Sequence, residues 1–356
     1  MRHKQGSPHG LRKSTLCART AFALAVLVFA STFLTACKKK ETTKTGTILA
    51  LDTFVSITVT GQQSEEAFTA AARRLTELED KFSRTKEGSE IDRLNHATEE
   101  EPVTLSEETY KLLSTTLWFA KDTDGIFDPT VGPLMDAWGF GKDERKIPED
   151  ARIEETLSRV DHSRIHLLPD NRAYVEEGTV VDLGGAAKGY IGDALMQEIA
   201  KYKVRRAILD LGGNICAFDA EKALVIGVVS PRELSVLAVK VDLPKKEASA
   251  PMSVITSGAY ERYIEVDGVR YGHIMDTTTG RPVETDLLSA TVITTNGAEG
   301  DILSTVLFAM GTEKAKEYAK TKGIGCILLS EDGTAWVNEE WKESVHAEEG
   351  WTVRSF

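Results

Sequence analysis

Residues 180–190 read VVDLGGAAKGY, a short apolar run followed by glycines, a lysine and the start of a helical pattern. We predict a strand over Val180-Val181 and, after the glycines, a helix that continues through Ala194, Leu195 and Ile199. The passage from strand to helix therefore takes place over Asp-Leu-Gly-Gly, where the backbone is least hindered.

This segment is suited to holding an anion. Glycines let the backbone approach a ligand closely, a helix N-terminus offers free N–H groups, and Lys188 adds a positive charge for phosphate. The segment is neither a Walker loop, which needs Gly-Lys-Ser/Thr, nor a Gly-x-Gly-x-x-Gly loop. Taken alone, such a segment is more often an ordinary tight turn.

A second copy of the motif follows, because residues 209–213 read LDLGG and residues 181–185 read VDLGG. Two strands that end in this way would place carboxylates and backbone amides at neighbouring ends of a sheet. The spacing of 28 residues is too short to indicate a repeat architecture.

Strand and helix patterns on both sides of the motif do not alternate regularly. Leu49–Thr60 reads as one strand, a helix runs from Ser64 to Phe82, and another begins near Ser106. Further strands are predicted at 207–211, 224–229 and 236–241, helices at 298–310 and 313–322, and hairpins at Asp267-Gly268 and Asp332-Gly333. We therefore predict an α+β fold with mixed or antiparallel sheets and flanking helices, large enough to divide into two lobes.

Composition excludes several classes of protein. The 356 residues carry 43 Lys and Arg against 55 Asp and Glu, a net charge of −12, and 41% are hydrophobic. These values exclude a collagen, a disordered tail and a disulfide-stapled miniprotein. The acidic balance disfavours nucleic acid as a partner, because phosphates are neutralised by Lys and Arg. Cys216 and Cys326 lie in apolar runs, where a buried free thiol is commoner than a disulfide.

The N-terminus has the features of an export signal. Met1 to Arg19 contains five basic residues and no acidic ones, and an apolar run then ends in Leu-Thr-Ala-Cys at Cys37. This ending resembles a bacterial lipobox, which implies cleavage before Cys37 and lipidation of its thiol. We predict a signal peptide over 1–36, a lipidated tether over 37–46 and a folded body over 47–356. An uncleaved anchor helix is the alternative, and both place the body outside the cytoplasm.

Asp301 and Thr305 lie four residues apart in a predicted helix, so their side chains share one face. A carboxylate and a hydroxyl are an oxygen-only pair, which suits a hard Mg²⁺ ion that keeps waters and phosphate oxygens. The alternative is an Asp placed favourably in the first helical turn and a Thr bonded back to the helix backbone.

His273 and Asp276 lie three residues apart at the end of a predicted strand. His273 could accept a proton from an attacking hydroxyl, with Asp276 as its orienting partner or as a carboxylate beside a metal. A lone histidine in such a place is more often structural.

Residues 127–134, FDPTVGPL, and residues 138–141, WGFG, form a turn-rich stretch of backbone donors and aromatic rings. Such a stretch could flank a flat heteroaromatic ring, although aromatic residues bounded by glycines more often simply pack.

Together these segments resemble the ApbE-type FAD:protein FMN transferase family, from about Leu51 to Gly311. The resemblance rests on motifs in a shared order: LDT at 51–53, SEIDRLN at 89–95, FDPTVGPL, WGFG, DLGGAAKGY at 182–190, DLGGNI at 210–215, TSG at 256–258, HIMDTTTGRPV at 273–283 and DILST at 301–305. No single motif is diagnostic, but the ordered set is.

The resemblance implies a magnesium-dependent enzyme that breaks the pyrophosphate of FAD. It would join FMN to a Thr or Ser hydroxyl of an acceptor protein as a phosphoester and release AMP. The acceptors implied are subunits of membrane redox complexes of the Rnf or sodium-translocating NADH:quinone reductase type. A lipid-anchored enzyme on the periplasmic side of a bacterial inner membrane suits that task.

The resemblance also implies roles for individual residues. Mg²⁺ would be held by the carbonyl of Gly185 and the side chains of Asp301 and Thr305. The residues expected to line the FAD are Leu51, Phe127, Asp128, Asp182, Lys188 and Ile274. His273 is our candidate for the base. Two alternatives remain: a pyrophosphatase that yields FMN and AMP, and a lipoprotein that binds flavin without catalysis.

Overall fold

The computed structural model describes residues 40–140 and 147–356. The predicted signal peptide, Cys37 and the end of the WGFG motif lie outside the described residues. Residues 42–356 form one compact unit, with no boundary between two lobes in the part that is described. Within the described ranges, no helix is both long enough and apolar enough to cross a membrane.

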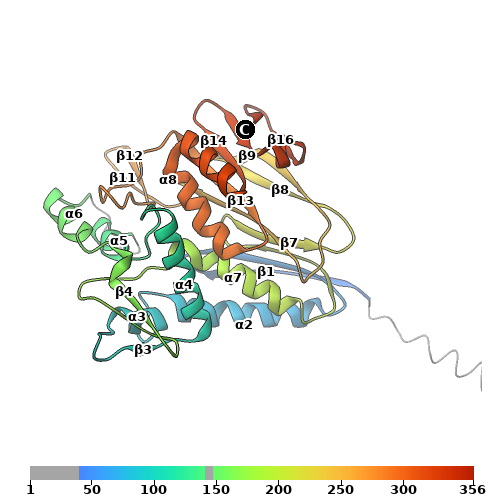
Figure 1. The fold of residues 1–356 in the computed structure, drawn as a ribbon. Coiled ribbons are helices and arrows are strands. Elements are labelled where there is room, and N and C mark those ends of the chain that lie inside the picture. The colour runs from blue at the N-terminus through green and yellow to red at the C-terminus, as the bar shows by residue number, and fades with distance from the viewer. Residues whose placement is uncertain (1–39, 141–146) are drawn as a thin grey trace, which may run out of the picture. The chain divides into compact units, whose positions relative to one another are not determined.

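A nine-stranded sheet is the centre of the fold (Figure 1). Its neighbouring strands are antiparallel except for the parallel pair β15 and β17, which confirms the predicted α+β class with a mixed sheet. In spatial order the strands are β1 (Thr42–Ala50), β2 (Thr53–Gly61), β6 (Val204–Asp210), β7 (Asn214–Asp219), β10 (Met252–Gly258), β13 (Leu287–Thr294), β14 (Gly325–Ser330), β15 (Thr334–Val337) and β17 (Thr352–Ser355).

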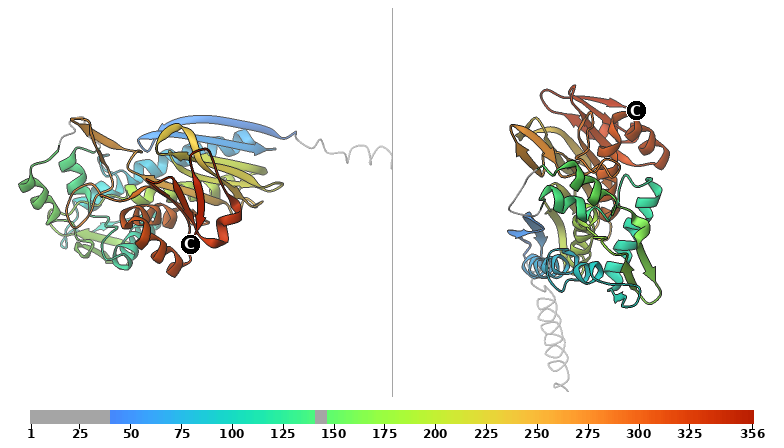
Figure 2. Two further views of the ribbon diagram at one scale, coloured as in Figure 1. Left: turned by 90° about the horizontal axis from the view of Figure 1, so that it is seen from above. Right: turned by 90° about the vertical axis from the view of Figure 1, so that its left-hand side faces the viewer.

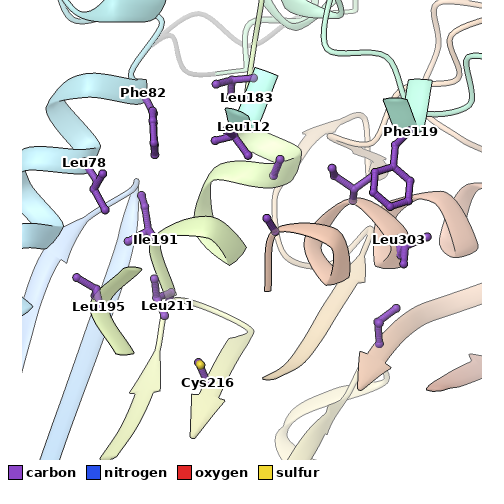
Figure 3. Close-up of a cluster of buried hydrophobic side chains, with 14 of the residues drawn as sticks. Leu78, Phe82, Leu112, Phe119, Leu183, Ile191, Leu195, Leu211, Cys216 and Leu303 are labelled. Atoms are coloured by element: carbon purple, nitrogen blue, oxygen red, sulfur yellow. The ribbon is translucent and has the colours of Figure 1, made fainter. Parts of the chain in front are cut away.

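Helices cover one face of this sheet. They are α2 (Ser64–Phe82), α7 (Gly184–Ile199) and α8 (Gly297–Lys322), and α4 (Glu107–Asp122) packs on α7 and α8. Figure 3 shows Leu78 and Phe82 of α2 pointing toward Ile191 and Leu195 of α7, with Leu211 beneath them. Burying these apolar faces is the main source of stability, at about 25 cal/mol per Å² of apolar surface removed from water.

The opposite face of the large sheet is covered by a small sheet of β16 (Val345–Ala347), β9 (Glu233–Leu243) and β8 (Leu224–Ser230). Inward residues of β8 such as Ile226 pack against Val254 and Leu329 of the large sheet, while the alternate residues of β8 face solvent. The large sheet is therefore covered on both faces, which explains why its central strands β10 and β13 are buried along almost their whole length.

Most of the remaining elements lie at one end of the sheet (Figure 2). They are α3 (Glu90–Asn95), β3 (Val103–Thr104), α5 (Gly132–Trp138), α6 (Asp150–Leu157), β4 (Ile165–Leu168), β5 (Arg172–Val175), β11 (Tyr263–Val266) and β12 (Val269–Gly272). A separate apolar cluster, which includes Trp138, Ile153, Ile264 and Met275, joins α5 and α6 to β11. This cluster fixes the segments that flank the candidate site.

Several predicted elements are confirmed. Helix α2 spans Ser64–Phe82, although its N-cap is Gln63 rather than Ser64. Ser106 caps α4, and both hairpins turn where predicted. The predicted helices 298–310 and 313–322 form α8, which is interrupted at Gly311. Cys216 and Cys326 are buried free thiols.

Three predictions about local structure are wrong. The single strand over Leu49–Thr60 is two strands, because the chain turns at Leu51-Asp52, both with φ of 55°. Residues 42–46 of the predicted tether belong to β1. Val180-Val181 is not part of a strand: the backbone of Val181 is bonded to the side chain of Asn95, which competes with sheet pairing.

Candidate active site

Two cavities meet at the start of α7. The smaller, of about 140 Å³, and the larger, of about 770 Å³, share Asp182, Lys188, Glu261, Arg262 and His273 among their lining residues. The smaller cavity also reaches the predicted residues Phe127, Asp128, Gly185, Ile274, Asp301 and Thr305. Leu51 lines the larger cavity. The fold therefore brings almost all the predicted site residues to one place, although they span 255 positions of the sequence, from Leu51 to Thr305.

Asp301 is the buried acid of this site, only 2% exposed. One carboxylate oxygen accepts a hydrogen bond from the backbone N–H of Gly189 (2.9 Å) and the other from the side-chain amide of Asn214 (2.9 Å). The Nζ of Lys188 lies 3.9 Å from the same carboxylate. These contacts fix the orientation of the Asp301 carboxylate within the cavity wall.

A close crossing of α7 and α8 produces this arrangement. A Cβ added to Gly189 would lie 2.0 Å from the carbonyl oxygen of Gly297, and one added to Gly297 would lie 2.5 Å from the carbonyl oxygen of Gly189. Only glycine at both positions allows the two backbones to approach so closely. This approach brings the Gly189 N–H within reach of Asp301, one turn into α8.

Thr305 lies one helical turn after Asp301 and faces the same cavity. Its hydroxyl is 3.3 Å from the carbonyl oxygen of Asp301 and 3.2 Å from the hydroxyl of Ser257. The first contact is the hydrogen bond from Thr305 to its own helix backbone that we gave above as the alternative to metal binding. In that bond the hydroxyl is the donor, so a lone pair on its oxygen remains for another partner.

The residues present fit a hard divalent cation. Gly185, Asp301 and Thr305 offer a carbonyl, a carboxylate and a hydroxyl on one cavity wall, and all three are oxygen donors of the kind Mg²⁺ prefers. The side-chain oxygen of Asn214, next to Asp301, is buried without a hydrogen-bond partner among the described residues. Those residues contain no cluster of three His, Cys, Asp or Glu side chains, so a transition-metal site of that kind is not found in them.

Asp182 is held at the start of α7 by a residue that the sequence analysis missed. Arg84 donates from Nε to Asp182 (2.7 Å) and from a terminal nitrogen to Asp136 (3.0 Å). The other oxygen of Asp182 accepts from the N–H of Gly184 (2.8 Å). Arg84 is distant in the sequence and belongs to no recognised motif, so only the fold reveals it.

His273 lies between Lys188 and Arg262. Burial, together with these two positive charges, lowers the pKa of His273 to about 3, so its ring is neutral near pH 7. Its Nδ1 lies 3.2 Å from the carbonyl oxygen of Arg262, which can only accept, so Nδ1 carries the proton. The Nε2 atom is therefore the one available to accept a proton.

Asp276 does not contact the ring of His273 as predicted. Its carboxylate accepts hydrogen bonds from the backbone N–H of Thr278 (2.8 Å) and from the hydroxyl of Thr278 (2.6 Å). These bonds leave the pKa of Asp276 below its usual value even though burial raises it. Asp276 stabilises the turn after His273, and the Arg262 carbonyl takes the orienting position.

Asp128 lines the smaller cavity, but both its carboxylate oxygens are occupied. One accepts from the backbone N–H and hydroxyl of Thr130, at 2.8 and 2.5 Å. The other accepts from the backbone N–H of His162 (2.9 Å) and lies 3.2 Å from its ring Nδ1. Asp128 therefore shapes the loop that places the Phe127 ring beside Gly185, where an added Cβ would be 2.9 Å from that ring.

Glu261 is a second titratable residue that the sequence analysis missed. It lines both cavities, and burial raises the pKa of its carboxyl group to about 7, with Lys188 lowering it and Asp301 raising it. Its sequence signal is weak, because Glu261 follows Thr256-Ser257-Gly258 without a spacing that marks a catalytic acid.

This fold is shared with solved flavin transferases. The chain is similar to the ApbE protein of Thermotoga maritima, with a TM-score of 0.77 and 32% identity, over 85% of this chain and 99% of that one. It is also similar to the flavin transferase ApbE of Vibrio cholerae, with a TM-score of 0.74 and 26% identity, over 86% and 100% of the two chains.

The chain belongs to the ApbE family, whose model matches residues 51–328. Among its relatives is the FAD:protein FMN transferase of Treponema pallidum, 32% identical over 75% of this chain and 74% of that protein. Another is the FAD:protein FMN transferase of Klebsiella pneumoniae, 32% identical over 69% of this chain and 77% of the relative.

Proposed function

We propose that this protein is a magnesium-dependent FAD:protein FMN transferase. It cleaves FAD, attaches FMN through a phosphoester to a Thr or Ser hydroxyl of an acceptor protein, and releases AMP. The observation that carries the proposal is the oxygen-lined wall of Gly185, Asp301 and Thr305, in a cavity that also contains Lys188 and His273. The names of the relatives support the same activity.

The oxygens of Gly185, Asp301 and Thr305 would hold the magnesium ion. When bound, the ion would neutralise charge on the diphosphate of FAD and stabilise the departing phosphate. Asn214 and the Gly189 N–H keep the Asp301 carboxylate oriented toward this place. Hydrogen bonds of this kind to a metal-binding carboxylate fix its orientation before the metal binds.

Lys188 and the start of α7 supply the rest of the phosphate site. The Lys188 side chain is mostly buried, and its Nζ faces the cavity close to Asp301. In the first turn of α7 the N–H of Gly184 already bonds to Asp182, so Gly185 is the residue there whose backbone N–H would face an anion. Phe127, packed against Gly185, provides an aromatic surface beside this turn.

Two residues are placed to accept the proton of the acceptor hydroxyl. His273 has its Nε2 available, but a pKa of about 3 makes it a weak base in the absence of bound substrate. Glu261, with a pKa of about 7, is a stronger base in the same cavities. We retain His273 as the proposed base and name Glu261 as its competitor.

The acceptor and the location complete the proposal. We expect a subunit of an Rnf or NADH:quinone reductase type complex as the acceptor. We also expect a lipid anchor at Cys37 to hold the enzyme on the periplasmic side of the inner membrane, where such a subunit would be within reach. The motif at Leu34–Cys37 and the polar residues that follow it support this placement.

The test is an assay with the purified protein, FAD, Mg²⁺ and an acceptor domain, read as fluorescent flavin on a denaturing gel. We expect Asp301→Ala to reduce transfer by at least about 100-fold, because the ion and the diphosphate lose their charged ligand. Asp332→Ala, in the turn between β14 and β15 and outside both cavities, is the matched control and should retain transfer. Free FMN and AMP without a labelled acceptor would indicate a pyrophosphatase, and uncleaved FAD would indicate simple binding.

The same assay separates the two candidate bases. Loss of transfer in His273→Ala, with FAD binding intact and Glu261→Gln active, would assign the base to His273. The reverse pattern would assign it to Glu261.

A further inference from the structure

The tip of the β1–β2 hairpin exposes two large apolar side chains. Leu49 is 74% exposed and Phe54 is 71% exposed, and the two are opposite each other in the strand register. We call this pair the hairpin tip. Exposed apolar pairs of this kind are unfavourable in water unless another surface covers them, so the hairpin tip requires an explanation.

Apolar character on this face is confined to the tip. Away from the turn, the next three pairs on the same face consist entirely of hydroxyl residues: Thr47 with Ser56, Thr45 with Thr58, and Thr43 with Thr60. A sheet face that was apolar along its whole length would not change from an apolar pair to hydroxyl pairs in this way. The apolar pair is found only where the hairpin meets the active site.

The turn that follows the pair forms part of the rim of the larger cavity. Leu51 and Asp52 line that cavity, and the side chain of Asp52 is 86% exposed, as expected at a rim. Leu49 and Phe54 line neither cavity that makes up the site. They therefore flank the opening, where they would meet a macromolecule rather than the flavin.

The turn is also held firmly in place. Leu51 and Asp52 both adopt left-handed backbone conformations, which are unfavourable for a leucine. Glu79 accepts a hydrogen bond from the Leu51 N–H (2.6 Å), and Arg262 donates to the Leu51 carbonyl (2.8 Å). Because Arg262 also orients His273 through its own carbonyl, the hairpin tip is fixed relative to the candidate base.

We propose that the hairpin tip is the docking surface for the acceptor protein, and that it binds an apolar segment beside the acceptor Thr or Ser. This inference rests on the proposed transferase function, since only a protein acceptor has to approach the rim of the cavity. Leu49 and Phe54 bind the acceptor outside the cavity, and the hydroxyl then reaches past Leu51 and Asp52 toward His273.

The test compares the double variant Leu49→Thr, Phe54→Thr with the wild type. Threonine continues the hydroxyl pattern of this face and keeps strand propensity, so the hairpin should remain folded. The matched control is Val225→Thr, Leu234→Thr, on β8 and β9, where both side chains are 60% exposed and line neither site cavity. The probe is an isolated Rnf-type subunit domain that carries the acceptor threonine.

We expect the hairpin variant to raise KM for the acceptor domain by at least about tenfold, the loss typical of removing contact residues at the centre of an interface. The dissociation constant of FAD and kcat at saturating acceptor should stay within twofold of wild type. The control should match the wild type in every measurement.

Three results would overturn the inference. If the wild type transfers FMN and the hairpin variant shows an unchanged KM, docking lies elsewhere while the transferase function stands. If the hairpin variant instead loses affinity for phosphatidylglycerol vesicles at unchanged KM, the tip binds lipid. If the wild type binds FAD but transfers none to the acceptor domain, the proposed function fails and the docking surface with it.

Discussion

Gly189 shows how one missing side chain supports the candidate site. Its backbone touches that of Gly297, and its N–H bonds to Asp301. In an exposed helix, Gly→Ala stabilises by up to about 1 kcal/mol, because alanine has the higher helix propensity. Here the added Cβ would have to push two helix backbones apart.

We therefore expect Gly189→Ala to destabilise the protein by about 1–3 kcal/mol, as overpacking does, and to lower transfer by displacing Asp301. Gly192→Ala in the same helix is the control, because its Cβ would meet its neighbours at 3.7 Å, an ordinary contact distance. Urea unfolding of the two variants measures the difference. Equal stability of Gly189→Ala and wild type would show that the crossing tolerates a methyl group.

At the level of elements, α8 is interrupted at Gly311 and restarted by a residue outside the helix. Gly311 has φ of 73° and ψ of 170°, so the ladder of helical bonds breaks there. The carboxylate of Asp286 accepts from the N–H of Thr312 (2.9 Å), which acts as a cap for the second half of the helix. Burial raises the pKa of Asp286, but this bond and the charge of Lys316 outweigh it and leave the pKa below its ordinary value.

We expect Asp286→Ala to cost about 1 kcal/mol of unfolding free energy at pH 7, the usual value of a lost helix cap. The folded-state pKa is lowered, so the unfolded chain binds more protons in acid. The Asp286 carboxylate therefore contributes fully to the free energy of unfolding above its pKa in the unfolded chain. This contribution is lost as pH falls through its pKa in the folded protein.

Asp286→Asn separates the cap from the charge, because it keeps an acceptor oxygen and removes the titration. Its stability difference from wild type should shrink as urea unfolding is repeated from pH 7 down to pH 3. A stability difference between Asp286→Asn and wild type that stays constant from pH 7 to pH 3 would contradict a stabilising role for the Asp286 charge.

Considered as one body, the described fold buries its large sheet on both faces, and this burial protects both thiols. Cys216 is 3% exposed and Cys326 is fully buried, and burial raises the pKa of each to about 12. A buried thiol that is rarely ionised reacts slowly.

We expect neither Cys216 nor Cys326 to react with iodoacetamide in the native protein over an hour, and both to react once the chain is unfolded in urea. Mass spectrometry of the peptides that contain them gives the result. A reducing agent should leave the melting temperature unchanged, since the two thiols are free. Native labelling of either cysteine would mean that the sheet opens locally.

Features written in short-range patterns were predicted well. The apolar spacing from Ala67 to Phe82 defined α2, and Asp-Gly dipeptides located both later hairpins. The hairpin at Leu51-Asp52 was missed, because that turn has neither Gly nor Asn. Its left-handed conformation is held by Glu79 and Arg262, which are 28 and 211 residues away from Leu51.

For the site, the order of the motifs was enough to identify the family, and the four-residue spacing of Asp301 and Thr305 placed both on one helix face. A spacing of this kind involves only nearby residues, so it can be recognised from the sequence alone. Arg84, Glu261 and the orientation of His273 by Arg262 emerged only from packing. These contacts form between segments that are distant in the sequence. Which segments meet is decided by the burial of apolar surface and by the crossing of α7 with α8, and both are properties of the whole fold.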